Sequence, residues 1–361
     1  GCSAAARFLS ENKEWLHDNC ETVYYLHEGV KGFMADEIGD PVQLKGECPI
    51  ALDERVPFDR DAPARETLRG RNIVITGGTR GLGRLQAFQA LQDGADHVTI
   101  TGRPAASGGT ALDGERTEAE LAALFGADRI AYVASDVRSA ADGKALFDPQ
   151  VRAERGLPAD VHSVSLNAGI FGPAGDDRRV DAIAPEAFDA VMDTNCKGVF
   201  LGIQNFVKEQ SHVPDKKVVA IKSIYGSQGS AFSNPAYQAS KFCVDGLVKQ
   251  SAISLARPEA DLPHAVQVNS VSPGFAKSSM TGEFYANADV ERLIGSAHPT
   301  GTWVDPNDVA RTVSWLFDAP PSITGTDVYV DNGVRAESVP DRERTAAIKR
   351  VSDAPCCGGS E

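Results

Sequence analysis

The sequence predicts an α/β protein: a doubly wound, seven-stranded parallel sheet preceded by an N-terminal helical extension. From about Arg71, short β-branched runs alternate with longer stretches of helical period, which is typical of repeated βαβ units. A glycine-rich turn, Thr76–Gly83, follows the first run, where such a sheet binds phosphate groups. The first seventy residues differ, because apolar residues recur every seven positions from Leu9 to Val30.

Strands and helices are expected to alternate along this region. The strands, each bounded by Gly, Pro, Asp or Asn, are Asn72–Thr76, His97–Thr101, Arg129–Ala134, Val161–Leu166, Lys217–Ser223, Ala265–Val271 and Thr326–Val330. The segments between them carry apolar residues three and four apart, the spacing that covers one face of a helix. These helices are Leu82–Gln92, Glu115–Phe125, Ser139–Phe147, Pro185–Glu209, Pro235–Ala256 and Pro306–Phe317. Right-handed crossovers then place helices on both faces of the sheet.

Three parts are expected along the chain. Residues 1–68 form a helical extension and connector, 69–336 the sheet domain, and 337–361 a flexible, polar tail. Within the extension, Ala4–Glu28 has the period of one or two amphipathic helices. The extension either packs on the flank of the sheet domain, which we favour, or binds a protein partner through residues 1–65.

Composition and charge restrict the class of protein. The 361 residues are 42% hydrophobic and 24% charged, which fits a globular chain and is too apolar for a disordered one. The net charge of −14 disfavours nucleic acid and anionic membranes as partners. No apolar run approaches the ~18 residues of a membrane span. We expect a soluble protein of the cytoplasm or an organelle interior, since a start at Gly1 allows a removed targeting segment.

The cysteines and histidines predict no metal site. The seven cysteines are scattered without a CxxC pair, which indicates neither a disulfide framework nor a zinc site. Cys196 and Cys243 are expected to be buried packing thiols. Cys356 and Cys357 could be redox-active, although exposure in the tail explains this pair equally well. The histidines lack a metal-binding spacing such as HExxH.

The glycine-rich turn has the composition of a phosphate-binding loop. Only residues without a Cβ let the backbone approach a pyrophosphate, and the following helix N-terminus presents free N–H groups. The expected contact residues are Gly77, Thr79, Arg80, Gly81, Leu82 and Gly83. The alternative is an ordinary glycine-rich βα turn. The position of this turn, directly between a strand and a helix, argues against that alternative.

Three motifs together resemble the short-chain dehydrogenase/reductase family, in its single-domain branch with a Rossmann fold. They are Thr76–Gly83 (TGGTRGLG), Asn167–Gly169 (NAG) and Tyr237–Lys241 (YQASK). The likeness runs from about Arg71 to Gly333 and excludes the extension. It implies an oxidoreductase that moves a hydride between a nicotinamide cofactor and a carbonyl or secondary alcohol. The resemblance also implies a homo-oligomer, either a dimer or a tetramer.

Two arginines favour NADP(H) as the cofactor. The second strand leads into Arg103, at the place where an acidic residue would favour NAD. A guanidinium there can hold a 2′-phosphate through paired hydrogen bonds. Arg80, inside the glycine turn, adds a second cation. Either arginine alone could be an ordinary surface charge, which is less plausible for both together.

The resemblance implies further cofactor contacts. Residues after the third strand would frame the adenine, residues after the fourth would support the central strand and the ribose, and residues after the sixth would bind the nicotinamide carboxamide. These residues are Asp136, Val137, Asn167, Ala168, Gly169, Pro273, Gly274 and Ser278.

Tyr237 and Lys241 are the expected proton-transfer pair, because residues four apart share one face of a helix. A free tyrosine has a pKa of about 10. The ammonium of Lys241, together with the charge of oxidised nicotinamide, should lower it toward the working range. The alternative is a tyrosine that only packs on the core. Ser223 argues against it, because it ends the fifth strand where its hydroxyl could hold the substrate oxygen; Ser227 is a lesser candidate.

By resemblance, two further roles complete the proton relay. Asn195 matches the family asparagine that kinks a helix and anchors a relay water through its backbone, and Lys241 would also bind the nicotinamide ribose. Asn195, Ser223, Tyr237 and Lys241 are thus the expected catalytic residues.

The substrate and two other functions stay open at this point. Apolar residues in the loops after strands four to six favour a partly apolar pocket, although covering the core explains them equally well; they are Phe171, Phe275, Met280, Phe284 and Tyr285. A different class of function is a subunit or scaffold of a larger assembly, docked through the N-terminal extension. Epimerase or dehydratase chemistry ranks last, because it expects a different glycine spacing.

Overall fold

The computed structural model describes residues 56–61, 65–104, 111–172, 179–229, 233–282 and 288–336. Contacts divide the chain into two units, Gly1–Val56 and Pro57–Glu361, and the account below concerns the second. The helices expected within Ala4–Glu28, most of the connector and the tail from residue 337 lie outside the described residues. The boundaries of the three expected parts therefore stay predictions.

Seven parallel strands form a single sheet in the order β3-β2-β1-β4-β5-β6-β7. Their bounds are β1 Asn72–Ile75, β2 His97–Gly102, β3 Ile130–Ala134, β4 Ser163–Leu166, β5 Lys216–Ile221, β6 Val266–Pro273 and β7 Asp327–Val330. The doubly wound parallel sheet predicted from the sequence is confirmed. Because the strand order reverses between β1 and β4, the loops after these two strands diverge and leave a crevice at their carboxyl ends.

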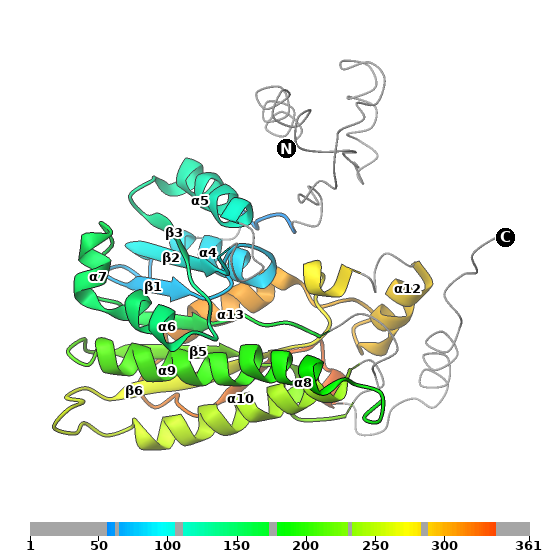
Figure 1. Cartoon of the computed structure of the whole chain (residues 1–361). Coiled ribbons are helices and arrows are strands. Elements are labelled where there is room, and N and C mark those ends of the chain that lie inside the picture. Colours follow the sequence, from blue (N-terminus) through cyan, green and yellow to red (C-terminus); the bar gives the residue numbers. More distant parts are fainter. Residues whose placement is uncertain are drawn as a thin grey trace, which may run out of the picture. The chain divides into compact units, whose positions relative to one another are not determined.

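Helices cover both faces of the sheet. They are α4 Gly81–Gln92, α5 Ala111–Phe125, α6 Ala140–Phe147, α7 Pro149–Glu154, α8 Pro185–Met192, α9 Gly198–Glu209, α10 Pro235–Ser254, α12 Ala288–Ala297 and α13 Pro306–Asp318. Figure 1 shows α6, α9 and α10 in front of the sheet and α13 behind it. Short 3₁₀ helices lie in the connecting loops; they are η3 Ile224–Gly226, η4 Ser279–Thr281 and η5 Val334–Ala336.

Two features of the helices differ from the sequence prediction. The segment expected as one helix, Pro185–Glu209, is interrupted by a π-helical turn, η2 Asp193–Lys197. The helices α7 and α12 were not expected from the sequence. A local signal for α7 was present, since Asp148 caps it by accepting from the Gln150 amide at 2.9 Å and a proline follows at the first helical position.

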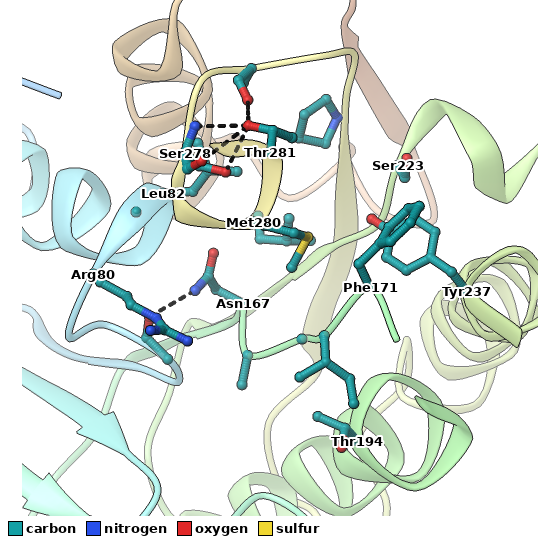
Figure 2. Close-up of a pocket in the computed structure, with 18 of the residues that line it drawn as sticks. Arg80, Leu82, Asn167, Phe171, Thr194, Ser223, Tyr237, Ser278, Met280 and Thr281 are labelled. Atoms are coloured by element: carbon teal, nitrogen blue, oxygen red, sulfur yellow. Dashed lines mark hydrogen bonds between the residues drawn. The ribbon is translucent and has the colours of Figure 1, made fainter. Parts of the chain in front are cut away.

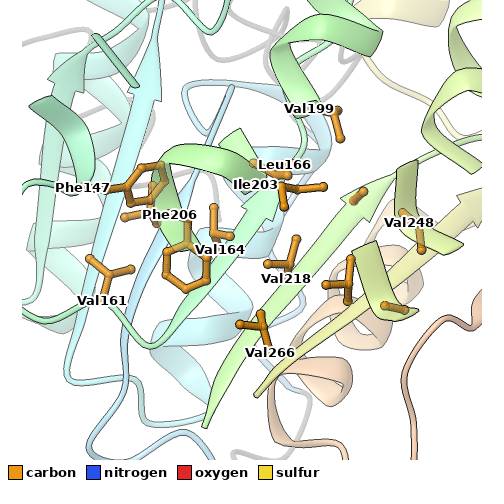
Figure 3. Packing of buried hydrophobic residues seen from close by; sticks show 14 of the residues in the cluster. Phe147, Val161, Val164, Leu166, Val199, Ile203, Phe206, Val218, Val248 and Val266 are labelled. Atoms are coloured by element: carbon orange, nitrogen blue, oxygen red, sulfur yellow. The ribbon is translucent and has the colours of Figure 1, made fainter. Parts of the chain in front are cut away.

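The main core lies between the sheet and the helices α9 and α10. Strands β4, β5 and β6 are buried on both faces, so polar residues such as Ser163 and Asn269 are buried beside the valines of the same strands. Figure 3 shows the packed side chains of this core; the labelled ones are Phe147, Val161, Val164, Leu166, Val199, Ile203, Phe206, Val218, Val248 and Val266. This packing fixes the strand ends from which the crevice is built.

The connector just before the sheet packs on α4 and α13. The ring of Phe58 stacks on Phe88 with centroids 4.2 Å apart, and the Arg84 guanidinium lies 3.8 Å above the Phe58 ring. Asp59 accepts from Arg311 at 2.6 Å. Residues 57–60 therefore belong to the flank of the sheet domain.

Candidate active site

A cleft of about 590 Å³ opens where the strands end, and the loops after β1 to β6 line it. Most of the expected site residues are among those that line it: Gly77, Thr79, Arg80, Gly81, Leu82, Arg103, Val137, Asn167, Ala168, Gly169, Ser223, Tyr237, Lys241, Pro273, Gly274 and Ser278. Figure 2 shows part of this lining, with Arg80 and Tyr237 on opposite sides. The cleft is not lined by three of the expected residues, Gly83, Asp136 and Asn195.

The glycine turn needs its glycines for close backbone packing. Gly77 has a φ of +64°, and a Cβ there would come within 2.9 Å of the Ala168 Cα. A Cβ on Gly83 would collide with the carbonyl oxygen of Gly77. The first turn of α4 is thereby drawn against the end of β1, so its free amide groups point into the cleft.

The amide of Asn167 ties the end of β4 to this turn. Its Nδ2 donates to the carbonyls of Thr76 and Gly77 at 3.0 and 3.1 Å, and its Oδ1 accepts from Gln86 at 3.1 Å. The Thr76 hydroxyl accepts from the Asn167 amide at 3.0 Å. Asn167 therefore shapes the glycine turn itself.

Two exposed arginines stand at the cofactor end of the cleft. The Arg80 side chain is 62% exposed, and its guanidinium lies 4.0 Å from the Asp113 carboxylate. Arg103 is also exposed, at the end of β2. Arg80, Arg103 and Asp113 all line the cleft, so two guanidinium groups and one carboxylate leave net positive charge there, which favours an anionic ligand.

Asp136 is turned away from the cleft. Its carboxylate forms an ion pair with Arg138 at 2.6 Å, and the Asp136 amide donates to Asp142 at 2.8 Å. The side chain therefore shapes the turn after β3, while the neighbouring Val137 reaches the cleft.

The start of α10 places Tyr237. Asn234 caps the helix by accepting from the Tyr237 amide at 2.8 Å, and Pro235 fills the first helical position. The Asn234 Nδ2 also donates to the Phe171 carbonyl at 2.7 Å, and the two rings of Phe171 and Tyr237 lie 4.9 Å apart. The same cap thus fixes both the phenol and the loop beside it.

The electrostatics of Tyr237 in the chain alone differ from the expectation. Burial raises the pKa of Tyr237 to about 12, against a hydrogen bond with Ser223 that lowers it. Burial lowers the pKa of Lys241 to about 8, so its amine is mostly protonated at neutral pH. The Lys241 Nζ lies 5.5 Å from the Tyr237 ring centre and donates to the Ile221 carbonyl at 2.8 Å. In the chain alone the nearby ammonium is therefore not enough to lower the Tyr237 pKa, and the second expected cause, the charge of oxidised nicotinamide, is needed in addition.

Ser223 lies beside the phenol, two residues after β5 ends. It caps η3, and its hydroxyl oxygen accepts from the Tyr225 amide at 3.2 Å. Figure 2 shows Ser223 and Tyr237 side by side at the same end of the cleft. Ser227 instead donates to the Ile224 carbonyl at 3.0 Å and is not a lining residue, which favours Ser223 as the substrate-binding hydroxyl.

Asn195 lies in the π-helical turn between α8 and α9, where the family resemblance implies a kink. Its Oδ1 accepts from the Ile170 amide at 2.8 Å, and its Nδ2 donates to the Ile170 carbonyl at 2.8 Å and to Ser240 at 3.0 Å. A π-helical turn leaves backbone groups without their usual helical partners. Asn195 therefore joins the loop after β4 to α10 from behind the cleft.

The expectation that Cys196 and Cys243 are separate packing thiols is wrong. The two form a disulfide with their Cα atoms 5.8 Å apart. They are 47 residues apart in sequence, and they meet because η2 packs on α10, a contact that cysteine spacing does not disclose. The bond joins the residue after Asn195 to the helix that carries Lys241.

Aromatic and apolar side chains wall the substrate end of the cleft. Phe171, Phe275 and Met280, expected from the sequence, are lining residues, whereas Phe284 and Tyr285 lie outside the described residues. Sequence reasoning missed Tyr225, whose ring meets Phe275 at 5.7 Å. Its position two residues after Ser223 was the available signal, because residues close to this serine border the same cleft.

Other lining residues that the sequence did not predict lie on the turns after the strands and on helices. Thr281 was missed; its hydroxyl accepts from the Ser278 amide at 2.9 Å and donates to the Ala276 carbonyl at 2.8 Å. The remaining missed lining residues include Asp113, Ser135, Ile170 and Thr194. Asp113 and Thr194 come from helices, where sequence order alone gives no indication of facing the cleft.

The residues that the structure describes contain no candidate metal cluster and no membrane-spanning helix. Within those residues, no group of three or more His, Cys, Asp or Glu side chains could hold a metal ion. None of the helices described is both long and apolar enough to span a bilayer.

Comparison with known proteins gives consistent matches over the sheet domain. The family model described as Enoyl-(Acyl carrier protein) reductase matches residues 78–335. The 3-alpha-(or 20-beta)-hydroxysteroid dehydrogenase of Mycobacterium tuberculosis is 30% identical over 272 residues, which are 74% of this chain and 91% of that protein. The NADP-dependent (R)-specific alcohol dehydrogenase of Lentilactobacillus kefiri is 28% identical, over 75% of this chain and 99% of its own.

Solved structures show the same arrangement. The structure "ElxO with NADP Bound" matches with a TM-score of 0.62 and 25% identity, covering 74% of this chain and 99% of that one. A 3-oxoacyl-(acyl-carrier protein) reductase from Brucella melitensis matches with a TM-score of 0.64 and 25% identity, over 77% and 96% of the two chains.

Proposed function

Because the chain belongs to the short-chain dehydrogenase/reductase family of oxidoreductases, we propose that it transfers a hydride between NADP(H) and a carbonyl or secondary alcohol. One observation carries the proposal. The glycine turn with Arg80 and the pair Ser223 and Tyr237 line the same cleft, so a dinucleotide held at one end would present its nicotinamide at the other.

The cofactor end of the cleft fits a dinucleotide that carries an extra phosphate. The glycine turn lines the cleft, and a Cβ at Gly77 or Gly83 would strike neighbouring backbone, so glycines there keep the turn tight enough to offer its amide groups to a pyrophosphate. Arg80 and Arg103 supply two exposed guanidinium groups for a 2′-phosphate. The NADP-dependent alcohol dehydrogenase of Lentilactobacillus kefiri and the NADP-bound structure of ElxO support this choice.

The chain's own residues then bind, orient and exchange protons. NADP(H), when bound, supplies the hydride chemistry. Ser223 would hold the substrate oxygen, and the Tyr237 hydroxyl would give a proton to a carbonyl or take one from an alcohol. Lys241 would stabilise the phenolate and bind the ribose, and the turn at Asn195 would hold the relay water.

The wall of the cleft favours an apolar substrate. Phe171 and Tyr237 face each other at 4.9 Å, and Tyr225 and Phe275 at 5.7 Å. Ser223 and Tyr237 supply polar groups at this end of the cleft, and a small number of hydrogen bonds is enough to orient an apolar ligand. We therefore propose a ketone or secondary alcohol with a hydrophobic body.

NADPH oxidation across ketones, aldehydes and quinones of increasing hydrophobic size tests the proposal. We expect turnover with bulky ketones, and a loss of about 10²–10⁴-fold in kcat for Tyr237→Phe, because the general acid is removed. NADPH binding, followed by its fluorescence, should be retained in that variant. Cofactor binding without turnover on any substrate would contradict the enzyme and favour the scaffold hypothesis.

A homo-oligomer is part of the same proposal. Phe200 on α9 and Phe242 on α10 are 44% and 46% exposed in the single chain, and large exposed apolar side chains support contact with another surface. Light scattering of the purified protein should give a dimer or tetramer mass. A monomer that keeps full activity would contradict this part.

A further inference from the structure

A buried ion cluster lies directly beneath the catalytic serine. The side chain of Lys222, the residue before Ser223, is 0% exposed. Its Nζ lies 2.7 Å from an Asp245 carboxylate oxygen and forms a second ion pair with Asp327. Its Nζ also lies 5.6 Å from the centre of the Tyr329 ring. None of the roles proposed above uses this lysine.

The cluster joins three elements that frame the reacting groups. Lys222 follows β5, Asp245 belongs to α10, and Asp327 begins β7. Tyr237 and Asp245 are two four-residue steps apart, with Lys241 between them, so all three face the same side of α10. The ion pair therefore attaches the reacting face of α10 to the strand end that carries Ser223.

The cluster is built to stay charged. Burial opposes the charge of Lys222, but hydrogen bonds with Asp245 and Asp327 outweigh it and raise the lysine pKa. Ser272 donates to the two Asp327 oxygens at 2.9 and 3.0 Å, and Ser270 donates to one of them at 2.9 Å. A buried charge with all its partners in place has a fixed geometry, and removing one partner leaves the others uncompensated.

The stem of Lys222 is also in close contact with the catalytic machinery. A Cβ on Gly226, three residues after Ser223, would meet the Lys222 Cγ at 2.8 Å and the Lys241 carbonyl oxygen at 2.7 Å. Only a glycine fits between these two groups. A shift of the Lys222 stem would therefore displace both the turn after Ser223 and the backbone of α10.

We propose that Lys222 is a positioning residue, which sets the separation of Ser223 and Tyr237 by joining β5, α10 and β7 through Asp245 and Asp327. This inference rests on the proposed function, because Ser223 and Tyr237 must be the pair that handles the substrate oxygen. It places the effect on the reacting end of the cleft. The glycine turn, which binds the cofactor phosphates, lies on another strand.

The chain offers a matched control on the same strand. Lys217 is 3% exposed at the opposite end of β5, where it pairs with Asp215 at 2.9 Å and donates to the Ala319 carbonyl at 2.9 Å. Lys217→Met removes one buried, paired ammonium from β5, and Lys222→Met removes one from the residue directly after β5. Both should lower thermal stability, but only Lys222→Met should alter the reacting geometry.

The test compares kcat at saturating NADPH, and the KM for NADPH from a separate titration, for the two variants well below their unfolding temperatures. Lys222→Met should lower kcat about tenfold to hundredfold, as expected for a small misplacement of reacting groups, with the KM for NADPH unchanged. Lys217→Met should keep kcat within about twofold, and Lys222→Arg should recover part of the loss. Equal kcat for the two Met variants, whether retained or reduced, would overturn the proposal.

A second pair of variants covers the case in which Lys222→Met does not fold. Asp245→Asn keeps the pair between Lys222 and Asp327 but weakens the attachment of α10, and should lower kcat severalfold. Lys249→Gln removes only the outer partner of Asp245, 2.6 Å from its second oxygen, and should leave kcat unchanged. Full kcat in Asp245→Asn would overturn the inference.

Tyr237→Phe, measured in parallel, separates the two levels of the argument. Turnover that does not depend on Tyr237 would mean that the proposed function fails. Turnover that depends on Tyr237 but not on Lys222 would mean that only this inference fails.

Discussion

The two ends of the cleft are held in different ways. At the cofactor end, Arg80 and Arg103 are exposed, and the contact of Arg80 with Asp113 is a loose 4.0 Å. At the reacting end, Lys241 and Asn195 are buried. The Lys241 Nζ donates to the Ile221 carbonyl at 2.8 Å, and the Asn195 Oδ1 accepts from the Ile170 amide at 2.8 Å. Catalytic groups are most effective when their positions are fixed before the substrate binds. A phosphate, in contrast, can be bound by exposed side chains that move to contact it.

The difference predicts which end is sensitive to which change. At the reacting end, changes should act on rate and on stability, because its groups are tied together covalently and by buried hydrogen bonds. At the cofactor end, changes should act mainly on affinity, because its cations are free to adjust. Four measurements rank these effects, from the largest free-energy change to the smallest.

Removal of the disulfide should have the largest effect on stability. Replacing Cys196 and Cys243 by Ser removes a cross-link between residues 47 positions apart. The unfolded chain then gains conformational entropy, which should lower the free energy of unfolding by about 4 kcal/mol. Urea unfolding of the wild type with and without reductant, beside the double variant, measures the loss. Reductant should have no further effect on the variant. Equal unfolding free energies in all samples would contradict a disulfide that staples the reacting end.

Acid should lower the free energy of unfolding through His97, which lies at the start of β2. Burial, aided by Arg152 and opposed by Asp128, lowers the pKa of His97 to about 4. The unfolded chain takes up this proton near pH 6.5. The contribution of the neutral histidine to the free energy of unfolding is therefore fully present above pH 6.5 and is lost as the pH falls toward 4. The total loss is about 3 kcal/mol.

Unfolding free energies between pH 7 and 4 check this for the wild type and for His97→Gln. The variant should lose stability less steeply over this range. The buried Lys241, whose pKa is lowered to about 8, has the same sign in a higher window, so stability should rise from pH 8 toward 10.5. Identical acid slopes for wild type and His97→Gln would exclude the histidine as the cause.

Loss of either cofactor arginine should act on affinity alone. We expect Arg80→Ala and Arg103→Ala each to raise the KM for NADPH about 10- to 100-fold, because a charge-assisted hydrogen bond to the phosphate is lost. The KM for NADH and the kcat should change little. Steady-state kinetics with both cofactors measure this, and a parallel rise for NADH would show that the arginines do not read the 2′-phosphate.

Asp113 should give the smallest effect. It is the one described carboxylate that faces Arg80 as an ion pair, so Asp113→Asn should lower the KM for NADPH about two- to threefold. An exposed pair of this kind is worth less than about 1 kcal/mol. The gain should vanish in 0.5 M salt, since salt screens exposed charges. A weaker affinity for NADPH in this variant would indicate that the carboxylate orders Arg80 for binding.

The sheet could be predicted from sequence because each strand carries its own signal. Runs such as Asn72–Ile75 are buried on both faces, and turn residues bound them, so local pattern and tertiary position agree. Tyr237 and Lys241 could be predicted for the same reason, as their spacing on one helix already brings them together.

What could not be predicted depends on contacts between distant elements. Cys196 and Cys243 meet only because η2 packs on α10, and Lys222 finds Asp245 and Asp327 across three elements. The direction of the Tyr237 pKa in the chain alone was missed because burial, which raises it, is a property of the folded crevice.

The central claim is that Tyr237 transfers the proton once Lys241 and the oxidised cofactor have made its phenol acidic. The pH dependence of kcat for alcohol oxidation at saturating NADP⁺ tests it most directly. Wild type should show one ionisation well below the value of about 12 of the chain alone, Lys241→Met should move it upward, and Tyr237→Phe should abolish it with most of the rate. A profile that is unchanged in both variants would contradict the account.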